Sequence, residues 1–325
     1  MPRSAVNNTL IPLFRKLSQK LGEQQAKSEL KWLTEHVREI ISEPRKEAHT
    51  AARIWREQPA FSEAELEQSS KRFSSVQWAW LRQAVSDRID SNKPLQYILG
   101  NQPFGKTQLA TRPPVLIPRW ETEEWMLRLA ALINDADTQE PLRILDACTG
   151  SGCIALGLAS ELNAMASITG VDVSDEAISL ASENLKRNAR RVRSNVEFKQ
   201  LDLLQEGALG GKQWDMIVAN PPYVSREEYG ELDASVRDWE DVRALVPASA
   251  GDPLATSFIV RLAALANRVC LQSGQKTSIP RLVVEIGGKH QVEPACQAMS
   301  DNGLGLTEVW KDMAGTERVV LGYVK

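Results

Sequence analysis

From residue 119 to the C-terminus, short apolar runs alternate with helix-like segments, and this alternation limits the fold more than any other feature. Alternating strands and helices predict a mostly parallel sheet with helices on both faces. Strands are expected at 142–146, 167–171, 195–199, 214–219, 281–286, 305–310 and 317–323, and helices at 121–134, 152–162, 175–189, 253–272 and 289–302. The last two strands can form a hairpin at the edge of the sheet. The sequence therefore predicts an α/β domain with seven strands.

The first ninety residues have a different pattern, with helical periodicity, polar breaks and few strand-like runs. Helices are expected at 10–21, 24–41, 46–56, 62–70 and 74–90, and Ser62 with Glu65 is a capping box for one of them. Residues 94–118 are rich in proline and glycine around strand-like pieces at 107–111 and 115–117. We therefore predict three parts: a helical domain over 1–93, a linker with a β-hairpin over 94–118, and the α/β domain over 119–325.

The run Asn220-Pro-Pro-Tyr223 follows one of the predicted strands directly. Two successive prolines continue neither a strand ladder nor a helix, so the strand must stop there. Its carboxyl end is the edge at which open α/β sheets bind ligands. The side-chain oxygen of Asn220 and the carbonyl of Pro221 can both accept hydrogen bonds from a planar NH2 group. Tyr223 can cover the flat face of that group and attract a nearby cation.

Polar side chains also stand at the ends of the three preceding strands, at Asp146, Asp172 and Asp202. Because the carboxyl ends of parallel strands share one edge, we expect these residues and Asn220 to form one connected site. Asp172 is placed to chelate the two hydroxyls of a ribose, and Asp202 to accept from an adenine amino group. The turn after Asp146 contains Gly150 and Gly152, which let the backbone pass close to a ligand. That turn alone is compatible with a dinucleotide, with S-adenosylmethionine, or with simple packing of a helix on a strand.

Composition and charge limit the classes of function. The formal net charge is −3 and the isoelectric point about 5.8, which argues against a dedicated nucleic-acid binder. No apolar run approaches the roughly 20 residues that span a bilayer, so no membrane association is expected. The four cysteines show no C-x-x-C pairing and the three histidines are scattered, so reduced thiols and no metal site are expected.

The N-terminus has two interpretations. Residues 1–22 contain four basic residues and no acidic one, and Leu10, Leu13, Phe14, Leu17 and Leu21 fall at helical spacing. An acid-free amphipathic start is typical of a mitochondrial transit peptide. The alternative is the first helix of a folded domain with a solvated basic face. We expect a mitochondrial protein, with a cytoplasmic one as the alternative.

The chain resembles the HemK/PrmC family of protein-(glutamine-N5) methyltransferases, which act on peptide chain release factors. The resemblance runs from about residue 10 to the C-terminus. It is carried by Gln96–Gly100, Gln102–Gly105, Leu116–Arg119 with Glu121-Thr122-Glu123, Asp146–Gly152, Asn220–Tyr223, Val284–Gly287 with Gln291, and Asp312, Gly315 and Arg318. Three departures stand out: Trp120 replaces a common proline, Ala147-Cys148 replaces a small residue and glycine, and the 235–255 segment differs from the family pattern.

This resemblance implies a Rossmann-like class I methyltransferase domain that uses S-adenosyl-L-methionine. It implies that Asn220, Pro221 and Tyr223 are catalytic. It also implies a substrate site at Asn220, Pro221, Pro222, Tyr223 and Glu121, and a cofactor site at Phe104, Thr122, Asp146, Thr149, Gly150, Gly152, Asp172, Asp202 and Asn220, roofed in part by Ile117 and Pro118. The implied partner is a release factor, whose Gly-Gly-Gln loop is presented to Asn220 while the helical domain binds the rest.

Three other functions fit parts of the pattern. A methyltransferase for the amino groups of adenine or guanine in nucleic acid shares the Asn-Pro-Pro-Tyr turn, but it needs a basic groove. A binding module on a methyltransferase scaffold has no use for an intact set of Gly150, Asp172, Asn220 and Tyr223. A nicotinamide-dependent dehydrogenase shares the strand ends but does not need Asn-Pro-Pro-Tyr, and the glycine turn is incomplete because Cys148 occupies its first position.

Overall fold

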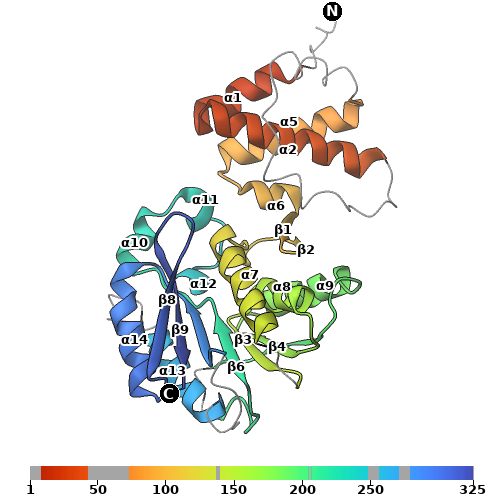
Figure 1. Ribbon diagram of the computed structural model, residues 1–325. Coiled ribbons are helices and arrows are strands. Elements are labelled where there is room, and N and C mark those ends of the chain that lie inside the picture. The colour runs from red at the N-terminus through yellow and green to blue at the C-terminus, as the bar shows by residue number, and fades with distance from the viewer. Residues whose placement is uncertain are drawn as a thin grey trace, which may run out of the picture. The chain divides into compact units, whose positions relative to one another are not determined.

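A computed structural model describes residues 9–42, 73–136, 140–203, 205, 207–247, 256–270 and 279–324. By its contacts the chain divides into two compact units, Met1–Gly100 and Asn101–Lys325 (Figure 1). The helices expected at 46–56 and 62–70, with the capping box of Ser62 and Glu65, lie outside the described residues. No described helix has both the length and the apolar character needed to cross a membrane.

The first unit is helical in the part that the structure describes. It contains α1 (Ile11–Leu21), α2 (Glu23–Ser42), α5 (Ser75–Asp90) and α6 (Leu95–Leu99). Ser74 and Gln77 form a capping box that starts α5. The apolar face of α1 is buried against α2 and α5 at Leu13, Phe14 and Leu17. The periodic leucines near the N-terminus therefore belong to the core of a folded unit, as the second interpretation of this segment predicts.

The second unit contains the predicted sheet of seven strands. Their order across the sheet is β5-β4-β3-β6-β7-β9-β8, and all neighbours are parallel except those that involve β9. The strands are β3 (Arg143–Ala147), β4 (Ser167–Asp172), β5 (Asn195–Gln200), β6 (Met216–Ala219), β7 (Leu282–Glu285), β8 (Leu306–Lys311) and β9 (Glu317–Tyr323). The predicted fold class is confirmed, as is the hairpin of the last two strands at the sheet edge.

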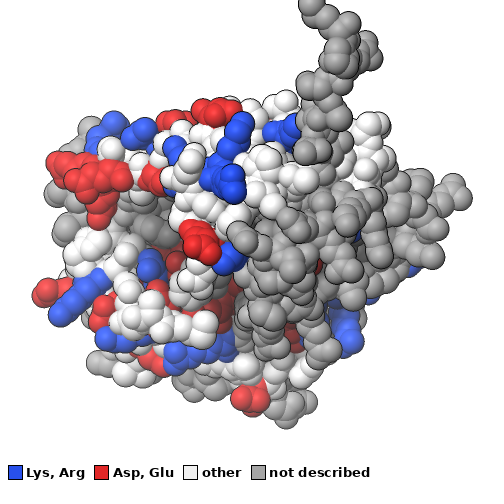
Figure 2. Space-filling view, turned by 90° about the horizontal axis from the view of Figure 1, so that it is seen from above, with Lys and Arg blue, Asp and Glu red and all other residues white. Residues whose placement is uncertain are grey.

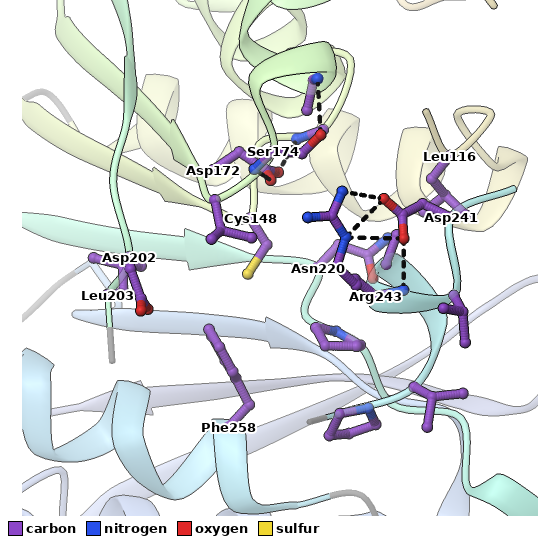
Figure 3. Close-up of a pocket in the computed structure, with 18 of the residues that line it drawn as sticks. Leu116, Cys148, Asp172, Ser174, Asp202, Leu203, Asn220, Asp241, Arg243 and Phe258 are labelled. Carbon is purple, nitrogen blue, oxygen red and sulfur yellow. Dashed lines mark hydrogen bonds and ion pairs between the residues drawn. The ribbon is translucent and has the colours of Figure 1, made fainter. Parts of the chain in front are cut away.

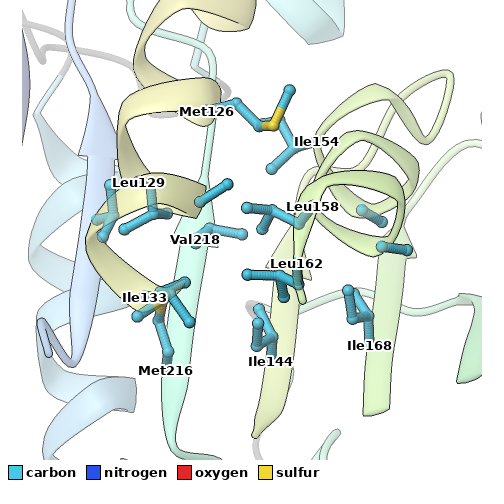
Figure 4. Packing of buried hydrophobic residues seen from close by; sticks show 14 of the residues in the cluster. Met126, Leu129, Ile133, Ile144, Ile154, Leu158, Leu162, Ile168, Met216 and Val218 are labelled. Atoms are coloured by element: carbon cyan, nitrogen blue, oxygen red, sulfur yellow. The ribbon is translucent and has the colours of Figure 1, made fainter. Parts of the chain in front are cut away.

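Helices cover both faces of this sheet because successive strand residues point to opposite sides. Ile144 and Met216 pack with α7 (Trp120–Asp135) and α8 (Cys153–Glu161), as Figure 4 shows. Leu145 and Ile217 pack with α13 (Ser257–Cys270) and α14 (Val292–Asp301) on the other face. The short helix η2 (Lys289–Gln291) precedes α14, and α9 (Asp175–Arg187) contacts β4 and β5.

Several short elements differ from the expectation. Residues 101–110 form an antiparallel hairpin of β1 (Asn101–Phe104) and β2 (Thr107–Ala110), but the strand-like piece at 115–117 forms no strand, and that prediction is wrong. Three helices follow β6 where none was expected: α10 (Arg226–Glu231), α11 (Ala234–Arg237) and α12 (Val242–Leu245). They are too short to show a helical period. The signals that mark them are cap residues: Ser225 and Glu228 form a capping box that starts α10, and Asp233 and Asp241 are the N-caps of α11 and α12.

Candidate active site

A cavity of about 800 Å³ lies at the carboxyl ends of the central strands (Figure 3). It is bounded by the ends of β3, β4 and β6, by Pro114–Leu116, and by the segment from Asp241 to Pro247. Ser257 and Phe258, at the start of α13, close another side. The volume falls in the range of about 300–1,000 Å³ that is typical of small-molecule sites. The predicted edge of the sheet therefore carries a cavity large enough for a cofactor.

Asp172 ties the glycine turn to the end of β4. One carboxylate oxygen accepts from the backbone N–H of Gly150 at 2.9 Å, and the other from that of Ser174 at 3.0 Å. Burial raises the pKa of this carboxyl, while these backbone hydrogen bonds oppose the rise. Each carboxylate oxygen keeps further acceptor capacity, and the residue lines the cavity. Asp172 can therefore accept from hydroxyl groups of a ligand without releasing the turn.

The turn itself is held in an unusual backbone conformation. Cys148, in the position where related turns carry glycine, has a φ of 59°, and its side chain lines the cavity. Burial raises the pKa of its thiol well above the ordinary value, so the thiol is neutral. Gly150 also has a positive φ of 54°, and a Cβ placed there would meet no atom within 4 Å. The backbone of Gly150 is thus open to a ligand.

Asp146 lies beneath the turn and is fully buried. Its Oδ2 accepts from the Thr149 hydroxyl at 2.6 Å and from the Ala155 N–H at 3.1 Å. Its Oδ1 is buried and has no partner in the part of the chain that the structure describes. Burial raises the pKa of this carboxyl to about 7, against the lowering effect of its two hydrogen bonds. Asp146 therefore shapes the turn from below.

An apolar part of the cavity lies next to Asp202. Leu203 adjoins Asp202 after β5, and the Phe258 ring extends toward the same region from α13 (Figure 3). An apolar and aromatic lining beside a single carboxylate suits a planar heterocycle that carries an amino group. This is the arrangement expected for an adenine.

The Asn220–Tyr223 turn follows β6 at the same edge. The Asn220 amide nitrogen donates to the hydroxyl oxygen of Thr122 at 3.2 Å, and Asn220 and Pro222 line the cavity. Pro221 is buried. The Tyr223 hydroxyl donates to Glu285 at 3.1 Å, and burial raises the pKa of this phenol, so it stays protonated. With its nitrogen engaged, Asn220 leaves its side-chain oxygen as an acceptor at the edge of the cavity.

The predicted site residues fall into two groups. The cavity is lined by Gly150, Asp172, Asp202, Asn220 and Pro222. The others are not among the residues that line the cavity: Phe104, Ile117, Pro118, Glu121, Thr122, Asp146, Thr149, Gly152, Pro221 and Tyr223. Phe104 is 1% exposed and belongs to the core. A Cβ on Gly152 would lie 2.8 Å from the Phe198 ring, so this glycine is required by packing.

Sequence reasoning missed the cavity wall formed by Asp241–Ala244, Val246 and Pro247. Asp241 and Arg243 form an ion pair at 2.6 Å on this wall, visible in Figure 3. The wall lies in the 235–255 segment, which departs from the family pattern. Asp241 is an N-cap whose side chain accepts from Arg243 N. A capping aspartate before a short apolar run was the available signal.

Charge on the described surface is mixed. On the face shown in Figure 2, Lys and Arg side chains lie among Asp and Glu side chains, and the described residues form no continuous basic field there. Within the described ranges, no group of three or more His, Cys, Asp and Glu side chains is arranged to hold a metal ion.

Comparison with known proteins places the chain in a family. Residues 129–234 match the family described as "Methyltransferase small domain". A fission yeast protein named "Probable MRF1 mitochondrial N(5)-glutamine methyltransferase mtq1" is 35% identical over 237 residues, which cover 71% of this chain and 75% of the relative. The chain belongs to the release factor glutamine methyltransferase family.

Two further relatives have the same family name. The "Release factor glutamine methyltransferase" of Fusobacterium nucleatum is 34% identical over 74% of this chain, and the match spans 63% of the bacterial protein. The human "MTRF1L release factor glutamine methyltransferase" is 34% identical over 75% of this chain and 71% of its own length. Family membership confirms two predictions: the chain is a glutamine-N5 methyltransferase, and its cofactor is S-adenosyl-L-methionine.

Proposed function

We propose that this enzyme methylates the side-chain nitrogen of the glutamine in the Gly-Gly-Gln motif of a peptide chain release factor. The observation that carries this proposal is the orientation of Asn220, whose amide nitrogen is engaged by Thr122 at the edge of the cavity. The side-chain oxygen is then the group left to accept from a substrate NH2. The names of the family relatives support a release factor as the protein that presents this glutamine.

The cavity residues fit the cofactor. Asp172 would hold the ribose hydroxyls, Asp202 the adenine amino group, and Leu203 with Phe258 the flat faces of the adenine. The open backbone of Gly150 leaves room for the ligand to lie against the turn. When bound, S-adenosylmethionine supplies an electrophilic methyl group on a positively charged sulfur.

Asn220 and Pro221 overcome the poor nucleophilicity of a carboxamide nitrogen. The lone pair of that nitrogen is delocalised into the carbonyl, and it carries two N–H bonds. Acceptance of these bonds by the Asn220 oxygen and the Pro221 carbonyl fixes the amide and stabilises positive charge as it builds on nitrogen. Preorganised dipoles of this kind contribute on the order of a hundredfold or more to turnover. Alignment of two bound reactants can contribute up to about 7–11 kcal/mol.

The experiment that tests the proposal is mass spectrometry of a recombinant release factor after incubation with enzyme and cofactor. A gain of one methyl group on the Gly-Gly-Gln glutamine is expected with the parent enzyme. Asn220→Ala should bind the cofactor with nearly unchanged affinity and lose turnover by roughly two orders of magnitude or more. Transfer of labelled methyl to RNA or DNA in place of the release factor would instead identify an amino methyltransferase of nucleic acid.

Two further parts of the proposal concern partner binding and compartment. We infer that the helical unit binds the release factor outside its Gly-Gly-Gln loop, and that the enzyme acts in mitochondria. The names of two relatives support the compartment, since the fission yeast protein and a Saccharomyces cerevisiae protein are both described as mitochondrial. Imaging of the full chain with a C-terminal fluorescent tag tests it, and cytosolic fluorescence alone would overturn it.

A further inference from the structure

Glu285, at the end of β7, accepts hydrogen bonds both from α7 and from the Asn220–Tyr223 turn. It is 1% exposed. Its Oε2 accepts from the Thr122 hydroxyl and from the Trp125 indole N–H, each at 2.7 Å, and its Oε1 accepts from the Tyr223 hydroxyl at 3.1 Å. One buried carboxylate therefore receives three donors from α7 and from the turn.

The direction of these hydrogen bonds determines how Asn220 is oriented. Oε2 already accepts from the indole N–H of Trp125, which can only donate, and the Thr122 hydroxyl donates its single hydrogen to the same oxygen. Thr122 can then only accept from Asn220, at 3.2 Å. An acceptor at that position selects the NH2 end of the Asn220 amide and turns the oxygen end away. If Thr122 were free to donate, the opposite orientation would be equally satisfied, and Asn220 would offer a donor where the substrate also has donors.

The surroundings of Glu285 point to function more than to stability. Among the described residues, no Lys or Arg nitrogen forms an ion pair with this carboxylate, and the nearby Arg318 bonds Asp312 instead, at 3.1 Å. Burial raises the pKa of Glu285, and the three neutral donors and the charge of Arg318 oppose that rise. A fully buried carboxylate costs free energy unless it is well hydrogen-bonded, and such groups concentrate at functional sites.

We propose that Glu285 is a positioning residue for methyl transfer: through the Thr122 hydroxyl it sets which end of the Asn220 amide faces the substrate, and it holds the Tyr223 hydroxyl directly. This inference rests on the proposed role of Asn220. Glu285 acts through Thr122 and Tyr223 and does not itself line the cavity. Its effect should therefore appear in kcat and not in cofactor affinity.

Thr122→Val is the decisive variant, because valine keeps the shape of threonine and removes the hydroxyl. We expect kcat to fall by on the order of ten- to a hundredfold, the usual effect of losing a supporting partner, with cofactor affinity and melting temperature near those of the parent. Thr122→Ser, which restores the hydroxyl, should recover most of the loss. Thr169→Val is the matched control, because the Thr169 hydroxyl on β4 also donates to a carboxylate, that of Glu197 on β5, at 3.1 Å. This control variant should leave kcat unchanged.

A double-mutant cycle separates orientation from a general loss of structure. In an Asn220→Ala background there is no amide to orient, so Thr122→Val should lower kcat by less than about twofold further. An equal loss in both backgrounds would overturn the inference, as would parent-like kcat in Thr122→Val alone. If Asn220→Ala itself keeps full turnover, the proposed function fails first. If only Asn220→Ala loses turnover, the inference about Glu285 fails alone.

Variants of Glu285 provide a second route that does not depend on Thr122. In Glu285→Gln the amide oxygen must face Trp125, because the indole N–H only donates, so Thr122 keeps its acceptor and the new NH2 faces Tyr223. Glu285→Leu removes every acceptor. We therefore expect a smaller fall in kcat for Glu285→Gln than for Glu285→Leu. Equal losses in two folded variants would show that hydrogen-bond acceptance is not the role of this residue.

Discussion

Arg119 and Glu240 form an ion pair that joins two walls of the cavity. One Arg119 nitrogen lies 2.8 Å and 2.7 Å from the two carboxylate oxygens. Arg119 is the N-cap of α7 and follows the wall segment Pro114–Leu116, while Glu240 precedes the wall that begins at Asp241. The backbone N–H of Asp241 also donates to the Pro114 carbonyl, at 2.7 Å. Glu240 and Asp241, in the segment that departs from the family pattern, are thus held in place by contacts with Arg119 and Pro114.

Removal of Arg119 should cost more stability than removal of the charge on Glu240. The Glu240 side chain is 1% exposed and that of Arg119 31%, so Arg119→Met leaves a buried carboxylate without its charged partner. We expect a loss of about 2–4 kcal/mol at neutral pH for Arg119→Met and about 1 kcal/mol for Glu240→Gln, measured by urea unfolding.

The loss in Arg119→Met should depend on pH. Burial already raises the pKa of Glu240, and Arg119 is the main influence that lowers it. Without Arg119, the folded pKa lies further above the unfolded value of about 4.3. A carboxyl of this kind stabilises the fold at low pH, and that stability is lost as the pH rises through the folded pKa. Equal losses at about pH 5 and about pH 8 would contradict this account.

Asp172→Asn should weaken cofactor binding with little effect on kcat at saturating cofactor. Asparagine has one acceptor oxygen, so its NH2 must face the N–H of either Gly150 or Ser174, and the ribose loses a charged acceptor. The dissociation constant measured by calorimetry should rise about ten- to a hundredfold, the scale of a hydrogen bond to a charged group. Asp175→Asn, an exposed substitution at the start of α9, is the control. Equal affinities in the two variants would remove Asp172 from the site.

The sheet could be predicted from the sequence because each strand is a short apolar run with a helix-like segment beside it. The carboxyl ends of parallel strands share one edge of a sheet, and this fact correctly predicts that Asp172, Asp202 and Asn220 line one cavity. The prediction depends only on parallel topology. The short helices after β6 could not be found in the same way, because four to six residues contain too little of a helical period.

Contacts between distant positions also lay beyond the sequence pattern. Glu285 appears in the sequence as one polar residue in an apolar strand, and its contact with Thr122 spans 163 positions. The ion pair of Arg119 and Glu240 spans 121 positions. No periodicity or motif spacing in the sequence predicts contacts across such separations. Phe104 and Gly152 belong to motifs of the family, but a motif also contains residues that are needed only for packing. The Phe104 side chain is part of the core, and Gly152 leaves the space that the Phe198 ring occupies.

Asp146→Asn should change how stability depends on pH. The carboxyl of Asp146 has a pKa raised from 3.8 to about 7 by burial, and about 1.4 kcal/mol accompanies each unit of such a shift. Its neutral form stabilises the fold at low pH, and this contribution is lost as the pH rises from about 4 to about 7. Asparagine cannot ionise, so the variant should gain stability relative to the parent across that range. Urea unfolding of the cofactor-free proteins measures the difference, and a constant difference between about pH 4 and about pH 8 would exclude the shifted pKa.

The two glycines of the cofactor turn should respond differently to alanine. Both have positive φ, 54° at Gly150 and 81° at Gly152, so each substitution carries a backbone cost of about 1–2 kcal/mol. At Gly152 the new Cβ would also lie 2.8 Å from Phe198 and 3.1 Å from Ala181, which adds about 1–3 kcal/mol of overpacking. At Gly150 the Cβ meets nothing within 4 Å and extends beside the cavity lining.

Gly152→Ala should therefore lose more stability in urea unfolding, and Phe198→Leu should restore part of it. Gly150→Ala should lose less stability but more cofactor affinity in calorimetry, because its methyl group occupies space that the ligand needs. The reverse order in either measurement would contradict the assignment of Gly150 to the ligand and of Gly152 to packing.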